Sequence, residues 1–91
     1  SADRAYELRI INRLPDGAAL VAALELAQTI GANGPLAVKA SKQVVVQSRL
    51  WTEDEMWKKQ QEIVAPIFTS EDAREGAAAF AEKRAPNWKG K

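Results

Sequence analysis

Acidic side chains are the residues of this chain best suited to acid–base chemistry, and several of them lie in two short runs. The runs are Glu53-Asp54-Glu55 and Glu71-Asp72. Two carboxylates can act as general acid and general base when both face one pocket and their pKa values differ. Each run, however, directly follows a Thr or Ser that is typical of a helix N-cap, where acidic side chains favour the positive end of the helix dipole. We therefore interpret them as helix-capping residues and expect no catalytic residue among them.

The composition excludes several other kinds of site. The chain has 91 residues with no histidine and no cysteine, so it offers neither a disulfide, nor a Cys or His nucleophile system, nor the commonest zinc ligands. We expect no metal site. The formal net charge of +1 argues against nucleic acid and anionic membranes as partners. No apolar run is long enough to span a membrane and no signal peptide is recognisable, so we expect a cytoplasmic location.

A basic cluster near the carboxyl terminus is the better candidate for ligand binding. Its residues are Lys83, Arg84, Lys89 and Lys91, which accompany Asn87 and Trp88. Such a cluster could bind the phosphates of a nucleotide, or it could be a solvated helix end whose cations offset the negative end of the dipole. Aromatic residues that could line a wall for an adenine are equally typical of a helical core or interface. These aromatics are Trp51, Trp57, Phe68, Phe80 and Trp88.

Apolar periodicity and capping signals predict a mainly α-helical chain that would position these residues. The expected elements are a short helix over residues 2–8, a short strand over 9–14, a turn over 15–17 with Gly17 at positive φ, and helices over 18–30, from 35 to at least 46, from 52 and from 69 or 70 to about 84. Pro66 is expected to end or kink the third of these longer helices. We expect the last helix to bury a stripe formed by Ala73, Gly76, Ala77 and Phe80.

The last third of the chain carries a motif that resembles a known family. Its residues 70–90 follow the pattern S-E-D-x-x-E-G-x-x-A-F-x-E-K-R-x-P-x-W/F-K-G. This pattern resembles the carboxyl terminus of the crotonase superfamily, the enoyl-CoA hydratases and isomerases. Residues 5–15 resemble the joint at which the catalytic core of that family ends, with Arg9 in the place of the usual Gly. That substitution raises the question of whether a left-handed turn is kept there.

The resemblance implies roles for particular residues. Lys83 matches a lysine that reaches the nucleotide phosphates of acyl-CoA, often in the site of a neighbouring subunit. Phe68, with Val64 one turn before it, matches a segment near the adenine and the outer pocket. The two catalytic glutamates and the oxyanion-hole amides of the hydratases match no position here, so we expect this chain alone to be inactive. The family assembles as trimers or hexamers and needs no cofactor beyond its acyl-CoA substrate.

Taken with the resemblance, the sequence predicts a fragment of an enoyl-CoA hydratase/isomerase-family protein. Residues 1–16 would end the joint to the core, and residues 17–91 would form a C-terminal helical region of about four helices. This region would contribute oligomer assembly and one wall of the acyl-CoA site, while the parent protein would hydrate 2-enoyl-CoA. A stand-alone helical module for self-association or protein interaction remains the alternative, because capping signals and amphipathic stripes would suit it equally well.

Overall fold

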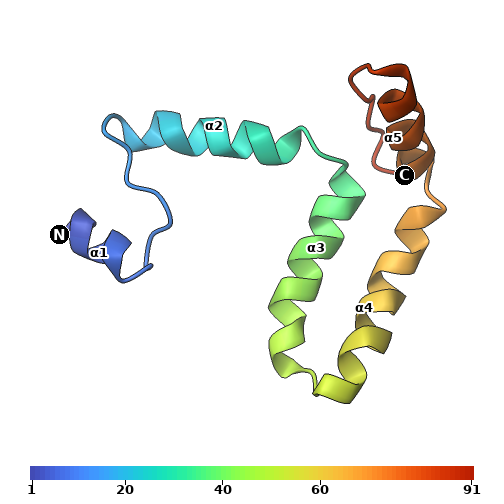
Figure 1. Cartoon of the computed structure of the whole chain (residues 1–91), viewed down its shortest axis with the longest axis horizontal. Helices are drawn as coiled ribbons and strands as arrows, with labels where there is room; N and C mark the ends of the chain where they lie inside the picture. Colours follow the sequence, from blue (N-terminus) through green and yellow to red (C-terminus); the bar gives the residue numbers. More distant parts are fainter. The chain divides into compact units, whose positions relative to one another are not determined.

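A computed structural model describes residues 1–91, and every regular element in it is helical. The elements are α1 (Ala2–Glu7), α2 (Ala19–Gly31), α3 (Pro35–Gln47), the short 3-10 helix η1 (Ser48–Leu50), α4 (Glu53–Phe68) and α5 (Glu71–Glu82). Figure 1 shows them in chain order. The chain divides into two compact units, Ser1–Ile30 and Gly31–Lys91. The prediction of a mainly α-helical region is confirmed, and none of its helices is long and apolar enough to cross a membrane.

In the first unit, α1 ends in a left-handed residue. Arg9 has a φ of 57°, its N–H donates to the Tyr6 carbonyl at 2.9 Å, and the Ile10 N–H donates to the Ala5 carbonyl at 2.9 Å. This pair of hydrogen bonds is a Schellman motif, which usually has Gly at the left-handed position. Arg9 therefore keeps the backbone conformation that glycine would adopt.

The short strand expected over residues 9–14 is absent, so that prediction was wrong. A strand is stable only when its N–H and C=O groups pair with a neighbouring strand, and the structure contains no second strand. The N–H groups of Ile10 and Ile11 instead donate back to the Ala5 carbonyl. The expected turn is a bend at residues 16 and 17, and Gly17 is not at positive φ.

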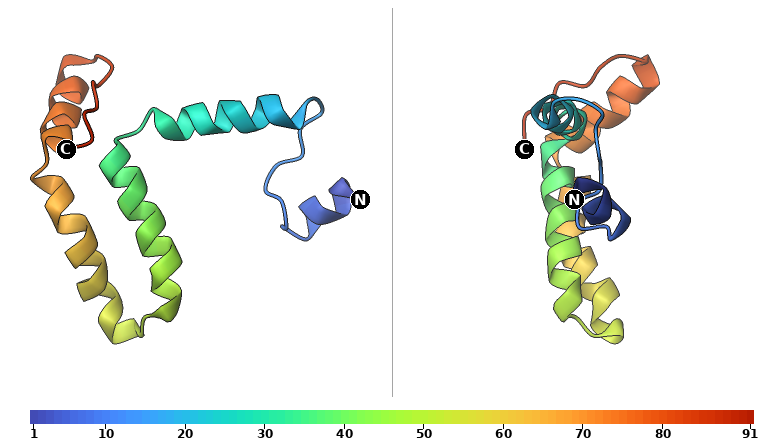
Figure 2. Two further views of the ribbon diagram at one scale, coloured as in Figure 1. Left: turned by 180° about the vertical axis from the view of Figure 1, so that it is seen from behind. Right: turned by 90° about the vertical axis from the view of Figure 1, so that its left-hand side faces the viewer.

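The second unit contains an antiparallel pair of helices. Figure 2 shows α3 and α4 side by side, joined through η1. Pro35 lies in the first turn of α3, where its missing N–H costs nothing. Thr52 is the N-cap of α4, as predicted, and forms a capping box with Glu55, whose Oε2 accepts a hydrogen bond from the Thr52 N–H at 3.0 Å. Pro66 lies inside α4 and does not end it, since the helix continues to Phe68.

Helix α5 begins at the predicted cap but buries a different face from the one expected. Ser70 Oγ accepts a hydrogen bond from the Ala73 N–H at 3.0 Å. The buried residues of α5 are Asp72 and Ala79, which are 4% and 2% exposed, whereas Phe80 is 76% exposed. The predicted inner stripe was therefore wrong at Phe80 and at Ala77, which is also exposed, whereas Ala73 and Gly76 are half-buried. The face that α5 buries is set by the chain that follows it, as described below.

Candidate functional site

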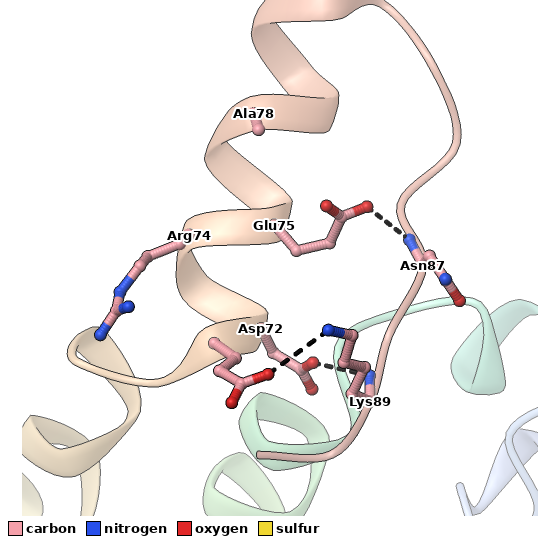
Figure 3. Close-up of a pocket in the computed structure, with 7 residues that line it drawn as sticks. Asp72, Arg74, Glu75, Ala78, Asn87 and Lys89 are labelled. Atoms are coloured by element: carbon pink, nitrogen blue, oxygen red, sulfur yellow. Dashed lines mark hydrogen bonds and ion pairs between the residues drawn. The ribbon is translucent and has the colours of Figure 1, made fainter.

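The last seven residues turn back along α5 and are held by two of its carboxylates. We call residues 85–91 the C-terminal strap. Asp72 accepts hydrogen bonds from the N–H groups of Lys89 at 2.7 Å and Gly90 at 2.9 Å, and its own N–H donates to the Lys91 carbonyl at 2.9 Å. One turn further along α5, Glu75 accepts from the Asn87 N–H at 2.7 Å (Figure 3). The bonds from Lys89 and Gly90 satisfy the carboxylate of Asp72, whose burial without hydrogen-bond donors would be destabilising.

Trp88 joins the strap to the start of α3. Its Nε1 donates to the Ala32 carbonyl at 2.9 Å, and its six-membered ring packs against Gly34 and Gly76. A Cβ added to Gly76 would lie only 3.0 Å from Trp88 Cη2. Absence of a side chain at Gly76 therefore allows the indole to approach the helix backbone. For Trp88, this contact favours the core interpretation over the adenine-wall interpretation.

A polar pocket of about 510 Å³ lies beside the strap (Figure 3). Its lining residues are Glu71, Asp72, Arg74, Glu75, Ala78, Asn87 and Lys89. The hydrogen bond from the Arg84 side chain, followed by that from the Asn87 N–H, lowers the pKa of Glu75 from 4.5 to about 2. Such a carboxylate stays ionised at neutral pH and is a poor general base, for which a pKa near 7 is needed. The geometry gives Glu75 a structural role, in agreement with its position between Arg84 and the strap.

The predicted basic cluster separates into paired and unpaired cations. Arg84 binds Glu75 and Glu82, and Lys89 Nζ lies 3.5 Å from Glu71 Oε2. Lys83 forms no ion pair, and its Nζ lies 4.3 Å from the centroid of the Phe80 ring. Lys91, in the strap, forms no ion pair either. Of the two adjacent cations at the end of α5, Lys83 is therefore the one that remains available to an anionic ligand.

The three residues predicted to contact substrate fall into two places in the structure. Phe68 is the last residue of α4 and is 75% exposed, and Val64 lies one turn earlier and is half-buried. Lys83 follows the last residue of α5, a helix of 12 residues. At a rise of 1.5 Å per residue, α5 places roughly 18 Å between its two ends. The structure thus brings Val64 and Phe68 together and leaves Lys83 apart from them.

Sequence reasoning missed two contacts at this helix end. The Phe80 ring lies under the ammonium group of Lys83, and Glu75 binds the next residue in the chain, Arg84. The spacing of Phe80 and Lys83 along a helix could have indicated the first contact, since residues three apart lie on one face. Nothing in the local sequence indicates the second contact, because it depends on how the chain turns after α5. No group of three or more acidic, His or Cys side chains is placed to hold a metal ion.

Comparison with known proteins gives a consistent result over the whole chain. The family model described as enoyl-CoA hydratase/isomerase matches residues 1–91. Enoyl-CoA hydratase EchA19 of Mycobacterium tuberculosis is 47% identical over 89 residues, which are 97% of this chain and 34% of that protein. Carnitinyl-CoA dehydratase of Salmonella typhi is 38% identical over 96 residues, covering 100% of this chain and 37% of the relative.

A solved structure extends the comparison to the fold. The crystal structure of an enoyl-CoA hydratase from Mycobacterium tuberculosis H37Rv superimposes with a TM-score of 0.95 at 53% sequence identity, over 99% of this chain and 36% of that one. The chain spans about a third of the length of the relatives that it matches. It therefore belongs to the enoyl-CoA hydratase/isomerase family and corresponds to the helical C-terminal portion of the crotonase-type fold.

Proposed function

We propose that this chain forms the assembly region and one wall of the acyl-CoA site in a protein that adds water across the double bond of a 2-enoyl-CoA. The names of the similar proteins support hydration over isomerisation, because a hydratase and a dehydratase both describe the addition or removal of water on a CoA-linked substrate. The hydratase glutamates and oxyanion-hole amides that the resemblance implies lie in the core and match no position in this chain. We therefore expect the whole protein to hydrate 2-enoyl-CoA and residues 1–91 alone to show no such activity.

The observation that carries the assembly role is the small amount of apolar surface that the chain buries. The buried apolar residues are Ala40 and Ala79, both small. Large apolar side chains are exposed on every α-helix, among them Leu20 on α2, Trp57 on α4 and Phe80 on α5. A chain that exposes so many large apolar side chains and buries so few normally has them covered by further protein. In the proposal, the catalytic core and neighbouring copies supply that cover.

Gel filtration with light scattering tests the assembly role. The isolated chain is expected to self-associate at micromolar concentration, because burial of apolar surface drives association. A stable monomer under these conditions would overturn this part of the proposal. The whole protein is expected to form trimers or hexamers.

The substrate-binding role assigns different parts of acyl-CoA to the two places described above. Lys83 would bind the nucleotide phosphates, since it is exposed and free of acidic partners. Val64 and Phe68 would contact the adenine and the outer pocket. The separation along α5 is compatible with a long ligand or with two sites contacted by one subunit.

Steady-state kinetics of the whole protein test the role of Lys83. An exposed charge contact is worth about 1 kcal/mol, which corresponds to roughly a fivefold change in binding. We expect Lys83→Gln to raise KM for 2-enoyl-CoA about fivefold and to leave kcat nearly unchanged, because the phosphates are remote from the reacting carbons. The matched control is Lys58→Gln, an exposed lysine of α4 without an ion pair. Equal effects of the two substitutions would contradict the assignment.

A further inference from the structure

Lys83 occupies a backbone conformation that lysine does not favour. Its φ and ψ are 56° and 38°, in the left-handed helical region. The Arg84 N–H donates to the Ala79 carbonyl at 3.0 Å and the Lys83 N–H to the Phe80 carbonyl at 3.4 Å, which makes this helix end a Schellman motif. A residue with a Cβ at that position costs about 1 kcal/mol relative to glycine. Such a conformation persists where the surrounding structure holds it, and it is often found at functional sites.

The side chain of Arg84, the residue that follows Lys83, binds the chain to α5 at this point. Its Nη1 and Nη2 lie 2.6 Å and 3.0 Å from the two carboxylate oxygens of Glu75, a bidentate arrangement that fixes both distance and orientation. Nη1 also donates to the Ala85 carbonyl at 3.2 Å, and Nε donates to Glu82. Glu75 lies two turns before the end of α5, so the ion pair ties the chain that leaves the helix back onto the helix.

The same contacts give the two adjacent cations different roles. Two carboxylates neutralise the Arg84 guanidinium, whereas Lys83 has none within ion-pair distance. The ammonium of Lys83 lies over the exposed Phe80 ring, at a distance that suits a cation–π contact. Of these two adjacent cations, Lys83 is thus the available one, with its backbone in the Schellman motif and its ammonium over the Phe80 ring.

We propose that Arg84 and Glu75 are positioning residues, whose ion pair holds residue 83 in the left-handed conformation and so sets where the Lys83 ammonium meets the phosphates of acyl-CoA. This inference rests on the proposed role of Lys83 in phosphate binding. Without the ion pair, the chain after α5 is free to leave the helix in another direction, and the Lys83 ammonium moves with it. The affinity for CoA then falls by as much as removal of the lysine itself would cause, about fivefold.

Charge reversal in the whole protein tests the inference. Glu75→Arg and Arg84→Glu are each expected to raise KM for 2-enoyl-CoA and the Kd of CoA about fivefold with kcat retained, and the double reversal is expected to restore most of both losses. Arg84→Lys keeps the charge and removes the two-pronged geometry, so it is expected to weaken binding as well. The control is Lys58→Gln, which removes an exposed lysine of α4 that forms no ion pair and is expected to leave binding unchanged.

A double-mutant cycle separates positioning from direct binding. If Arg84 acts through Lys83, Arg84→Gln causes no further loss in a Lys83→Gln background. An additional, independent loss would make Arg84 a direct ligand and overturn the inference, as would normal binding by Arg84→Gln alone. Failure of Lys83→Gln to affect binding would instead refute the proposed function. If charge reversal prevents folding, NMR contacts between Lys83 and the Phe80 ring in Arg84→Lys decide the question: unchanged contacts contradict the inference.

Discussion

Substitution of Gly76 by alanine should loosen the C-terminal strap. The new Cβ would lie 3.0 Å from Trp88 Cη2 and 3.3 Å from Cζ3, closer than side-chain packing normally allows. Movement of the indole is restricted, because Nε1 is bound to the Ala32 carbonyl and the same ring also packs beside Gly34. Relief of the clash therefore requires loss of the hydrogen bond or displacement of the strap.

The expected magnitude follows from three effects. Overpacking of this kind costs about 1–3 kcal/mol. Loss of the hydrogen bond instead costs about 1 kcal/mol, which lies in the same range, and the higher helix propensity of alanine cancels because α5 is helical whether the strap is docked or open. The net cost is therefore about 2 kcal/mol, which corresponds to roughly a 30-fold shift in the opening equilibrium of the strap.

Amide hydrogen exchange at Lys89 and Gly90 measures that equilibrium, because both N–H groups are held by Asp72 and exchange when the strap opens. Gly76→Ala is expected to lower their protection about 30-fold. The matched control is Gly31→Ala, because Gly31 is also helical and a Cβ there would meet no atom within 4 Å. Unchanged protection in Gly76→Ala would refute the argument that the indole fills the space of the missing side chain.

Three further predictions concern helix ends and charge. Arg9→Gly should stabilise the end of α1 by about 1 kcal/mol, because glycine adopts a φ of 57° without strain. The expected readout is slower hydrogen exchange of the Ile10 amide, and an unchanged exchange rate would argue against strain at Arg9. Ser70→Ala should destabilise the start of α5 by about 1 kcal/mol, because the Ala73 N–H loses its acceptor, and Ser70→Asp should keep the stability of the unchanged protein. Equal hydrogen exchange of the Ala73 amide in the unchanged protein and in both variants would contradict this prediction. The contribution of Glu75 to strap docking should be fully present above pH 4.5 and should decline as the pH falls toward 2, because its pKa is lowered on folding. Protection of the Asn87 N–H from hydrogen exchange, measured across this pH range, tests the sign of the effect. A rise in protection on acidification would refute the prediction.

The helix starts could be predicted from sequence because the interactions that form them are local. Thr52 with Glu55 and Ser70 with Ala73 are pairs three residues apart, and Pro35 acts through its own ring. Such signals depend little on the rest of the fold. The motif that runs from Ser70 to Gly90 likewise indicated the family from residue types alone, and the comparisons confirmed it.

The wrong predictions concern features that need a partner distant in the chain. Residues 9–14 have strand-forming side chains, yet no second strand is present to pair with them. Phe80 falls on an apolar stripe of α5, yet its ring is exposed and lies beneath Lys83. Within the candidate site, Lys83, Phe68 and Val64 were named from the resemblance, and the helix predicted from residue 69 or 70 to about 84 already separated Phe68 from Lys83.

The sequence by itself determined the helical content, most helix starts and the family of this chain, because these depend on neighbours within one or two turns or on a continuous motif. Only the tertiary structure decided which face of α5 is buried and which of the adjacent cations Lys83 and Arg84 stays unpaired. Those outcomes depend on the strap, where Trp88 reaches Ala32 across 56 positions and Arg84 reaches Glu75 across nine. Contacts of that separation are selected by packing and by the need to satisfy buried polar groups, and no local preference in the sequence specifies them.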